Sequence, residues 1–222
     1  MKRTILPCLL GLFCCIFAPA AELEIVTWPY HADGRLSILE DGVQPFYVMG
    51  YDRKAELNGA TRVEIDLPEH YQLWDGREAP PQAATAALHG VMPLRSHRPS
   101  RPGSYRSSES AGNLLLVLRP LPGAAPHATA RMRWFQDQRL LAEREIRIEL
   151  LRLPHKIVYS SDTPPMVGLW VNNPRFHPET LKLLYRSFAA AGVNYLMLDR
   201  NLAEISTAML KPLGIKIFLN QW

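Results

Sequence analysis

Cysteine is almost absent from the sequence. Its only three cysteines, Cys8, Cys14 and Cys15, lie within the first 20 of the 222 residues, so residues 21–222 contain none. This excludes disulfide scaffolds, thiolate zinc sites and cysteine nucleophiles from that part of the chain. A lipoprotein anchor needs a small residue before the modified cysteine, and Phe13 does not fit that position, so no lipid anchor is expected.

Long apolar runs are also scarce. The run from Ile5 to Phe17 is too short to span a bilayer comfortably, which takes about 20 residues. It follows the basic pair Lys2-Arg3 and precedes Ala18-Pro19-Ala20, an arrangement typical of a secretory signal peptide over residues 1–20. We therefore expect a mature chain that begins at Ala21, is secreted or periplasmic, and has no membrane segment after cleavage.

A strong excess of one charge is missing as well. The formal net charge of +4 falls to +2 once Lys2 and Arg3 leave with the signal peptide. This small excess does not favour a nucleic-acid partner. No glycine-rich phosphate loop follows the first apolar strand of the carboxyl-terminal part, which continues into Asn172-Asn173-Pro174-Arg175. No dinucleotide or other cofactor is therefore expected.

Period-two alternation of polar and apolar residues dominates residues 21–160. It is clearest in the segments Thr61–Leu67, Ala130–Trp134 and Glu145–Leu150, each of which predicts a strand with one wet and one buried face. Further strands are predicted over four short segments: Leu23–Trp28, Leu36–Leu39, Phe46–Tyr51 and Leu114–Leu118. Many short strands without a long helix predict an all-β antiparallel sandwich of the immunoglobulin-like or jelly-roll type.

One long segment interrupts this strand pattern. Residues 79–112 are rich in Pro, Ser and Ala and carry Arg95, Arg98, Arg101 and Arg106. Such a length is unusual for a connection inside a compact domain. Two interpretations stay open: a solvated loop, or a cationic surface that meets an acidic or sulfated polymer.

Residues 164–222 change to the pattern of an incomplete α/β segment. The apolar runs Met166–Val171, Val193–Leu198 and Ile215–Leu219 predict three buried strands. Between the first two, apolar residues recur at helical spacing, with Pro178 suited to the first turn and Gly192 to the end. These apolar residues are Leu181, Leu184, Tyr185 and Phe188.

A second helix is expected between the second and third of these strands. Asn201 and Glu204 have the spacing of a capping box, which predicts that the helix begins at Asn201. Leu202, Ile205 and Met209 would form its buried face. Right-handed β-α-β crossovers of this kind make a parallel sheet. The expected order is thus β-α-β-α-β.

This layout resembles that of secreted glycoside hydrolases in which an accessory β-sandwich precedes a (β/α)8 barrel. Residues 167–173, Val-Gly-Leu-Trp-Val-Asn-Asn, are similar to a first barrel strand and its loop, and residues 189–199 are similar to the turn and second strand of such barrels. Residues 215–222 would be the third strand. The resemblance implies a barrel that stops after three of eight strands, before the strands that usually carry the catalytic carboxylates. No catalytic residue is therefore assigned, and the chain is expected to be inactive alone.

The resemblance also implies where ligands would bind. Ligand-facing residues of a barrel lie at the carboxyl ends of its strands. Substrate-binding candidates are accordingly Asn172, Asn173, Asp199, Arg200, Asn220 and Trp222, with Gln221 beside them. The alternative for each is local: a turn at Asn172-Asn173, an ion pair between Asp199 and Arg200, and a chain terminus at Trp222.

Two functions follow from these observations. The first is the amino-terminal portion of a secreted glycoside-hydrolase-like protein, with a carboxyl-terminal tail after Pro164 that is labile and protease-sensitive. The second is a non-catalytic protein that binds polysaccharide, oligosaccharide or the cell envelope. Self-association through the open sheet edge is a third way to complete the fold.

Aromatic and histidine residues bear on the second function. Six aromatic residues could form a platform for carbohydrate, although aromatic residues in strands more often belong to the core: Trp28, Tyr30, Tyr47, Tyr51, Tyr71 and Trp74. The seven histidines are scattered without the spacing of a metal site, so no metal is expected.

Overall fold

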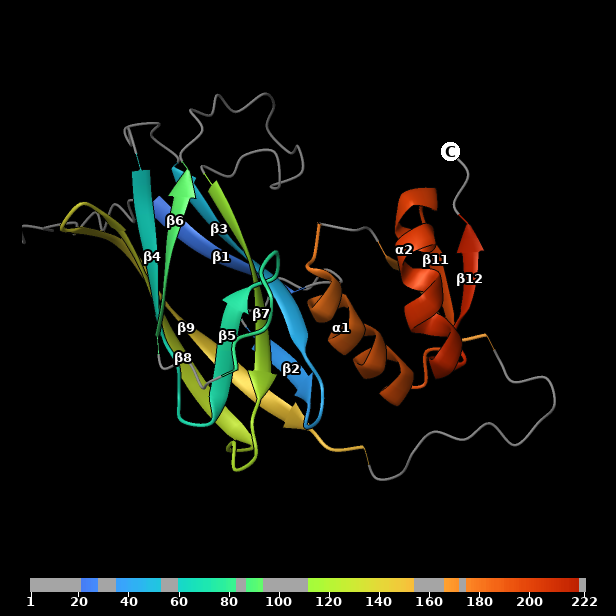
Figure 1. Cartoon of the computed structure of the whole chain (residues 1–222). Coiled ribbons are helices and arrows are strands. Elements are labelled where there is room, and N and C mark those ends of the chain that lie inside the picture. The colour runs from blue at the N-terminus through green and yellow to red at the C-terminus, as the bar shows by residue number, and fades with distance from the viewer. Residues whose placement is uncertain are drawn as a thin grey trace, which may run out of the picture.

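The computed structural model describes residues 21–27, 35–52, 60–82, 87–93, 112–153, 166–171 and 175–219. These residues form twelve β-strands, two α-helices and one short 3-10 helix, so the protein is rich in β-structure as expected (Figure 1). The signal-peptide prediction for residues 1–20 lies outside the described residues.

Nine strands form two sheets. The four-stranded sheet has the order β1-β3-β7-β5 and is antiparallel throughout. Its strands are β1 (Ala21–Thr27), β3 (Gln44–Asp52), β7 (Gly112–Pro120) and β5 (Tyr71–Asp75). The five-stranded sheet has the order β2-β9-β8-β4-β6. Its strands are β2 (Arg35–Leu39), β9 (Arg139–Leu151), β8 (His127–Gln136), β4 (Ala60–Asp66) and β6 (Ala87–Pro93).

These two sheets share one apolar core. Alternate side chains of both sheets meet there, for example Phe46 and Leu116 from one sheet and Ile65 and Ile148 from the other. Trp134 belongs to this core and has no exposed surface. The period-two pattern of the sequence thus corresponds to real inward and outward faces. We call residues 21–153 the two-sheet unit.

One strand pair departs from the antiparallel expectation. β2 runs parallel to β9, with Arg35 beside Arg147 and Leu39 beside Leu151. Alternation specifies which side chains turn inward but not the direction of the neighbouring strand, because both directions have the same side-chain period. The expectation of a purely antiparallel arrangement was therefore wrong for this pair.

Two strands were not predicted. In β5, Tyr71, Gln72, Leu73 and Trp74 are all buried, because both faces of this strand are covered, so no alternation appears in the sequence. β6 lies within residues 79–112, which were interpreted as a loop, and this interpretation was wrong for Ala87–Pro93. β6 pairs with β4 at the edge of its sheet, the position where proline and glycine are tolerated in a strand.

The remaining strands form a parallel sheet with two helices. The order is β10 (Gly168–Val171), α1 (Pro178–Ala190), β11 (Tyr195–Leu198), α2 (Arg200–Leu210), the 3-10 helix η2 (Lys211–Leu213) and β12 (Lys216–Leu219). β10 pairs with β11, and β11 with β12, both in parallel, so the predicted β-α-β-α-β order is present. Leu196 and Leu198 of β11 share one buried cluster with residues of α1 and α2 such as Leu181 and Leu202. Both helices therefore cover the same face of the sheet.

The end of α1 matches the prediction from Gly192. This glycine has φ +82°, and its N–H donates to the carbonyl of Ala189 at 3.0 Å. The N–H of Val193 donates to the carbonyl of Phe188 at 2.9 Å. These two bonds form a Schellman motif, which requires a left-handed residue at the position of Gly192.

The start of α2 differs from the prediction. The N-cap is Asp199 and not Asn201, because the Asp199 carboxylate accepts a hydrogen bond from the N–H of Leu202 at 2.7 Å. The buried face also differs from the prediction and consists of Leu202, Ala203, Ser206 and Leu210. Ile205, predicted to be buried, is 50% exposed.

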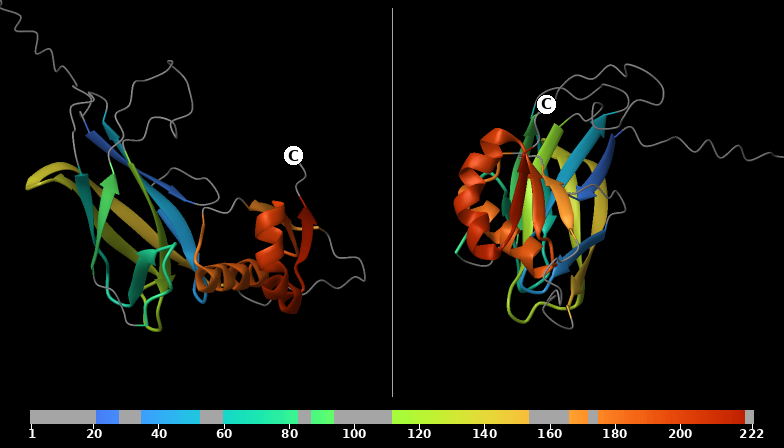
Figure 2. Two further views of the ribbon diagram at one scale, coloured as in Figure 1. Left: turned by 45° about the horizontal axis from the view of Figure 1, so that its top comes forward. Right: turned by 90° about the vertical axis from the view of Figure 1, so that its right-hand side faces the viewer.

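Helix α1 also packs against the two-sheet unit. Figure 2 shows α1 between the two-sheet unit and the parallel sheet. Val43, Trp74, Leu115 and Val117 belong to the same buried cluster as α1, so the outer face of the four-stranded sheet is covered by the helix. Polar contacts join the same surfaces. Thr180 Oγ1 accepts from Trp74 Nε1 at 3.1 Å, Ser187 Oγ accepts from the Val43 N–H at 2.9 Å, and the His177 N–H donates to the Gly76 carbonyl at 2.9 Å.

Candidate functional site

The carboxyl ends of β10, β11 and β12 meet at one edge of the parallel sheet, where the sequence places the substrate-binding candidates. Asp199 and Arg200 follow β11 directly, and both are exposed. The other candidates lie outside the described residues: Asn172, Asn173, Asn220, Gln221 and Trp222. The structure thus places two of the predicted residues at this edge.

Asp199 has a structural task at this edge. Its side chain caps α2 through the bond to Leu202, and its carbonyl accepts from the Ala203 N–H at 2.9 Å. A carboxylate is well suited there because the N-terminus of a helix carries partial positive charge. In the described part of the chain, no ion pair joins Asp199 to Arg200. Asp199 caps α2 instead, so the alternative interpretation of a local ion pair does not describe this residue.

Most of the candidate aromatic platform lies inside the molecule. Tyr51, Tyr71 and Trp74 are buried, and Tyr47 is partly buried against the cluster around α1. The Tyr71 hydroxyl donates to the carbonyl of Ala125 at 2.7 Å, and burial raises the pKa of Tyr71. The carbohydrate-platform interpretation was therefore wrong for these buried rings. Trp28 and Tyr30 lie outside the described residues.

Over the ranges that the structure describes, no group of three His, Cys, Asp or Glu side chains could hold a metal ion. None of the helices in these ranges has the length and apolar character needed to cross a membrane.

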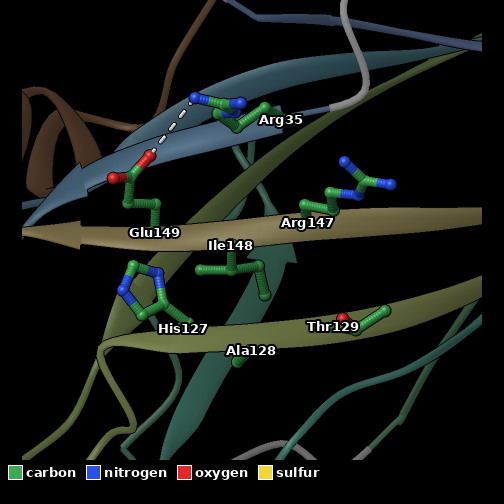
Figure 3. A pocket seen from close by; sticks show the side chains of 7 residues that line it. All are labelled: Arg35, His127, Ala128, Thr129, Arg147, Ile148 and Glu149. Atoms are coloured by element: carbon green, nitrogen blue, oxygen red, sulfur yellow. Dashed lines mark ion pairs between the residues drawn. The ribbon is translucent and has the colours of Figure 1, made fainter.

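A pocket of about 410 Å³ lies on the outer face of the five-stranded sheet, over β2, β9 and β8. Its polar lining comes from Arg35 on β2, Arg147 and Glu149 on β9, and His127 and Thr129 on β8 (Figure 3). Ala128 and Ile148 complete the lining. The Ile148 side chain belongs to the core, so the strands themselves form the floor of the pocket.

Strand register places the polar residues of the pocket in two rows. Arg35, Arg147 and Thr129 lie side by side across the three strands, and Ser37, Glu149 and His127 form the next row. Side chains directly opposite each other on neighbouring strands have Cβ atoms about 5 Å apart. One ion pair crosses between the rows, because Arg35 Nη1 lies 3.5 Å from Glu149 Oε2.

The sequence contained only part of the signal for this pocket. Alternation in the predicted strand Glu145–Leu150 places Arg147 and Glu149 on its wet face. In β8, Thr129 lies on the corresponding wet face. Arg35 joins them only because β2 pairs in parallel with β9, and no local pattern specifies that pairing.

Comparisons with known proteins give only distant similarities. No protein-family profile and no curated protein matches the chain. Solved structures with some likeness include tripeptidyl peptidase 2, at 12% identity and a TM-score of 0.33, covering 65% of this chain and 11% of that one. A Bacteroides ovatus GH5 xyloglucanase in complex with a XXXG heptasaccharide has 10% identity and a TM-score of 0.31, covering 90% of this chain and 45% of that one.

A third similar structure is the N-terminal domain of PorA, at 14% identity and a TM-score of 0.27, covering 58% of this chain and 97% of that domain. The chain spans less than half the length of the peptidase and of the xyloglucanase. At these TM-scores the likenesses assign neither a family nor a function to this chain.

Proposed function

We propose that this chain is the amino-terminal portion of a secreted glycoside-hydrolase-like protein. Residues 1–20 are its signal peptide, residues 21–160 an accessory β-sandwich, and residues 164–222 the first βαβαβ of a (β/α)8 barrel. On this proposal, the chain alone has no hydrolase activity.

The observation that carries the proposal is an exposed apolar face of the parallel sheet. Met197 and Phe218 are 43% and 47% exposed on the face opposite the helices, and the Phe218 ring stacks on Tyr195 with centroids 5.2 Å apart. Consecutive right-handed crossovers place both helices on one face, as in a barrel and in each half of a doubly wound sheet, so the other face needs a further cover. In a barrel the other face is filled by side chains of further strands. The exposed apolar face thus supports a larger fold, and the absence of a glycine-rich phosphate loop from the sequence after β10 favours a barrel over a dinucleotide-binding sheet.

The presence of a single carboxylate among the described residues at the sheet edge supports the absence of hydrolase activity. Glycoside hydrolysis needs two carboxyl groups about 5 to 9.5 Å apart across one bond. Among the described residues, Asp199 is the only carboxylate that directly follows one of the three parallel strands, and it caps α2. A single carboxylate with a capping role supplies neither the acid nor the nucleophile.

The position of Ala21 supports export with cleavage after Ala20. Ala21 is the first residue of β1, is only 8% exposed, and lies opposite Asp52 of β3. Cleavage there would leave a mature chain that begins with an ordered strand. Amino-terminal sequencing of the exported protein is expected to start at Ala21, and an uncleaved product would contradict this part of the proposal.

The coding sequence downstream of the codon for Trp222 tests the barrel assignment. We expect an open frame that encodes further βα units with carboxylates at the ends of their strands. A stop codon directly after Trp222 would contradict the assignment to a larger barrel.

Activity assays on the isolated chain test the absence of hydrolysis. We expect no turnover of a panel of chromogenic glycosides, and turnover of any of them would contradict the proposal. Retention of the chain on an immobilised glycan without turnover, together with a stop codon after Trp222, would favour the alternative of a non-catalytic carbohydrate-binding or cell-envelope protein.

A further inference from the structure

The pocket over β2, β9 and β8 contains an arrangement of charge that differs from the rest of its sheet face. Further along the same face, cross-strand neighbours have opposite signs: Glu145, Arg131 and Asp66 form one row, and Glu143, Arg133 and Glu64 the next. In the pocket, Arg35 and Arg147 lie directly beside each other. Like charges in this position destabilise a sheet.

Only one of the two arginines in this row has a carboxylate partner in the pocket. Arg35 pairs with Glu149, whereas Arg147 forms no ion pair within the described ranges and is exposed. Figure 3 shows the Arg147 guanidinium extending from β9 apart from the Arg35–Glu149 pair. By contrast, Arg131 lies 3.3 Å from Glu143, and Arg133 lies 2.8 Å from Asp66.

We propose that this pocket binds a monoanionic oxyanion group, a carboxylate or a sulfate ester, carried by a ligand of about the size of a sugar acid. Arg147 is the main ligand-binding residue, Thr129 beside it supplies a hydroxyl donor, and Arg35 adds positive charge. The site lies on the two-sheet unit and does not depend on how the parallel sheet is completed.

Charge and volume indicate the ligand class. Two arginines and Glu149 leave one positive charge in the pocket, which a single negative charge neutralises. A guanidinium presents parallel N–H donors that match the two oxygens of a carboxylate or sulfate. A volume of about 410 Å³ is that of a small-molecule site and exceeds the space needed by a bare inorganic ion.

Calorimetric titration at low ionic strength tests this site with three probes: D-glucuronate, D-glucose 6-sulfate and D-glucose. We expect one or both of the anionic sugars to bind and neutral D-glucose not to bind, with the affinity falling as sodium chloride is added. Binding of glucuronate alone identifies a carboxylate site, and binding of the sulfate ester alone identifies a sulfate site. Failure of both anionic sugars to bind, or equal binding of D-glucose, would overturn the proposal.

Arg147→Gln and Arg131→Gln form a matched pair of variants, because each removes one positive charge from the same face of the sheet. Arg147→Gln is expected to weaken binding of the anionic sugar about tenfold to a hundredfold, because it removes a charge-assisted hydrogen-bonding group. Arg131→Gln is expected to change it less than threefold.

Thermal unfolding without ligand gives a second readout. Arg147→Gln should unfold at the same or a higher temperature, since it relieves the repulsion with Arg35, whereas Arg131→Gln loses its pair with Glu143 and should not gain stability. Equal loss of binding in both variants would show a general charge effect, and a marked drop in the unfolding temperature of Arg147→Gln would show a structural role. Either result would overturn the proposal.

Discussion

At the scale of single residues, Tyr185 joins the two helices. Its hydroxyl lies 2.6 Å from Ser206 Oγ, and both side chains are buried between α1 and α2. Burial of the ring raises the pKa of Tyr185, the charge of Asp199 raises it further, and the bond to Ser206 lowers it by a smaller amount than burial raises it. The folded state therefore favours the neutral form of the Tyr185 side chain, and the bond to Ser206 connects α1 with α2.

Tyr185→Phe is expected to lower the free energy of unfolding by about 1 to 3 kcal/mol, because the buried Ser206 hydroxyl would lose its partner on α1. Urea denaturation monitored by circular dichroism measures the change. In the double variant Tyr185→Phe/Ser206→Ala the loss should be smaller than the sum of the two single losses. Additive losses would show that the two hydroxyls do not interact.

The raised pKa of Tyr185 predicts a loss of stability at alkaline pH. An unfolded tyrosine ionises near pH 10, so the stabilising contribution of the neutral folded phenol is fully present below about pH 10 and falls as the pH rises above it. The difference in unfolding free energy between the natural chain and Tyr185→Phe should therefore narrow above pH 10. A difference that stays constant through this range would contradict the prediction.

At the scale of elements, α1 is held between two surfaces. One side contacts the two-sheet unit through Thr180 and Ser187, and the other contacts α2 through Tyr185. The segment before α1 is also fixed, because Phe176 packs against Gly76 at the end of β5. A side chain at position 76 would have to displace that ring.

Gly76→Ala is expected to destabilise the protein by about 1 to 3 kcal/mol, because the added Cβ would lie 2.9 Å from ring atoms of Phe176. Gly168→Ala in β10 is the matched control. There the nearest atoms, of Tyr195, are 3.6 Å away, an ordinary contact, and no loss of stability is expected. Urea denaturation of both variants gives the comparison, and equal effects would show that the contact with Phe176 is not limiting.

At the scale of the whole molecule, the cluster around α1 connects the two-sheet unit with the parallel sheet. Val43, Trp74, Leu115 and Val117 come from the first, and Leu196, Leu198 and Ile215 from the second. Each fully buried side chain of this kind contributes about 1.5 to 3 kcal/mol. A tail that unfolds independently, as the sequence suggested for the region after Pro164, would have to expose this shared cluster.

Calorimetric unfolding is therefore expected to show one cooperative transition that includes both parts of the chain. Gly76→Ala should lower the temperature of that single transition. A separate, earlier transition accompanied by proteolysis after Pro164 would instead confirm the labile tail and contradict the coupling through α1.

The exposed apolar face of the parallel sheet predicts association of the chain at high concentration. Exposed apolar patches favour contact between molecules, and Met197 and Phe218 are each more than 40% exposed on this face. Phe218→Ser should shift sedimentation towards the monomer, whereas Ile205→Ser, at an exposed position on α2, should not. A monomer at all concentrations of the natural chain would contradict this prediction.

Much of the fold could be predicted because it follows from local patterns in the sequence. Alternation indicated the inward residues of β4, β8 and β9, and Pro178 with Gly192 indicated both ends of α1. The strands β5 and β7 differ from these three strands, because both of their faces are buried and the alternation that marks a strand is therefore missing. For β7 an apolar run remained as a signal, and for β5, Tyr-Gln-Leu-Trp-Asp, it did not.

The sequence by itself determined the β-rich character, the β-α-β-α-β order of the carboxyl-terminal part and the edge at which Asp199 lies, because helix and strand periods are local properties of the chain. Only the tertiary structure decided that Trp74 is buried under α1, that Asp199 caps a helix, and that Arg35 lies beside Arg147. Those three facts depend on pairings between segments far apart in the chain, and a local period carries no information on which distant surface will cover a side chain.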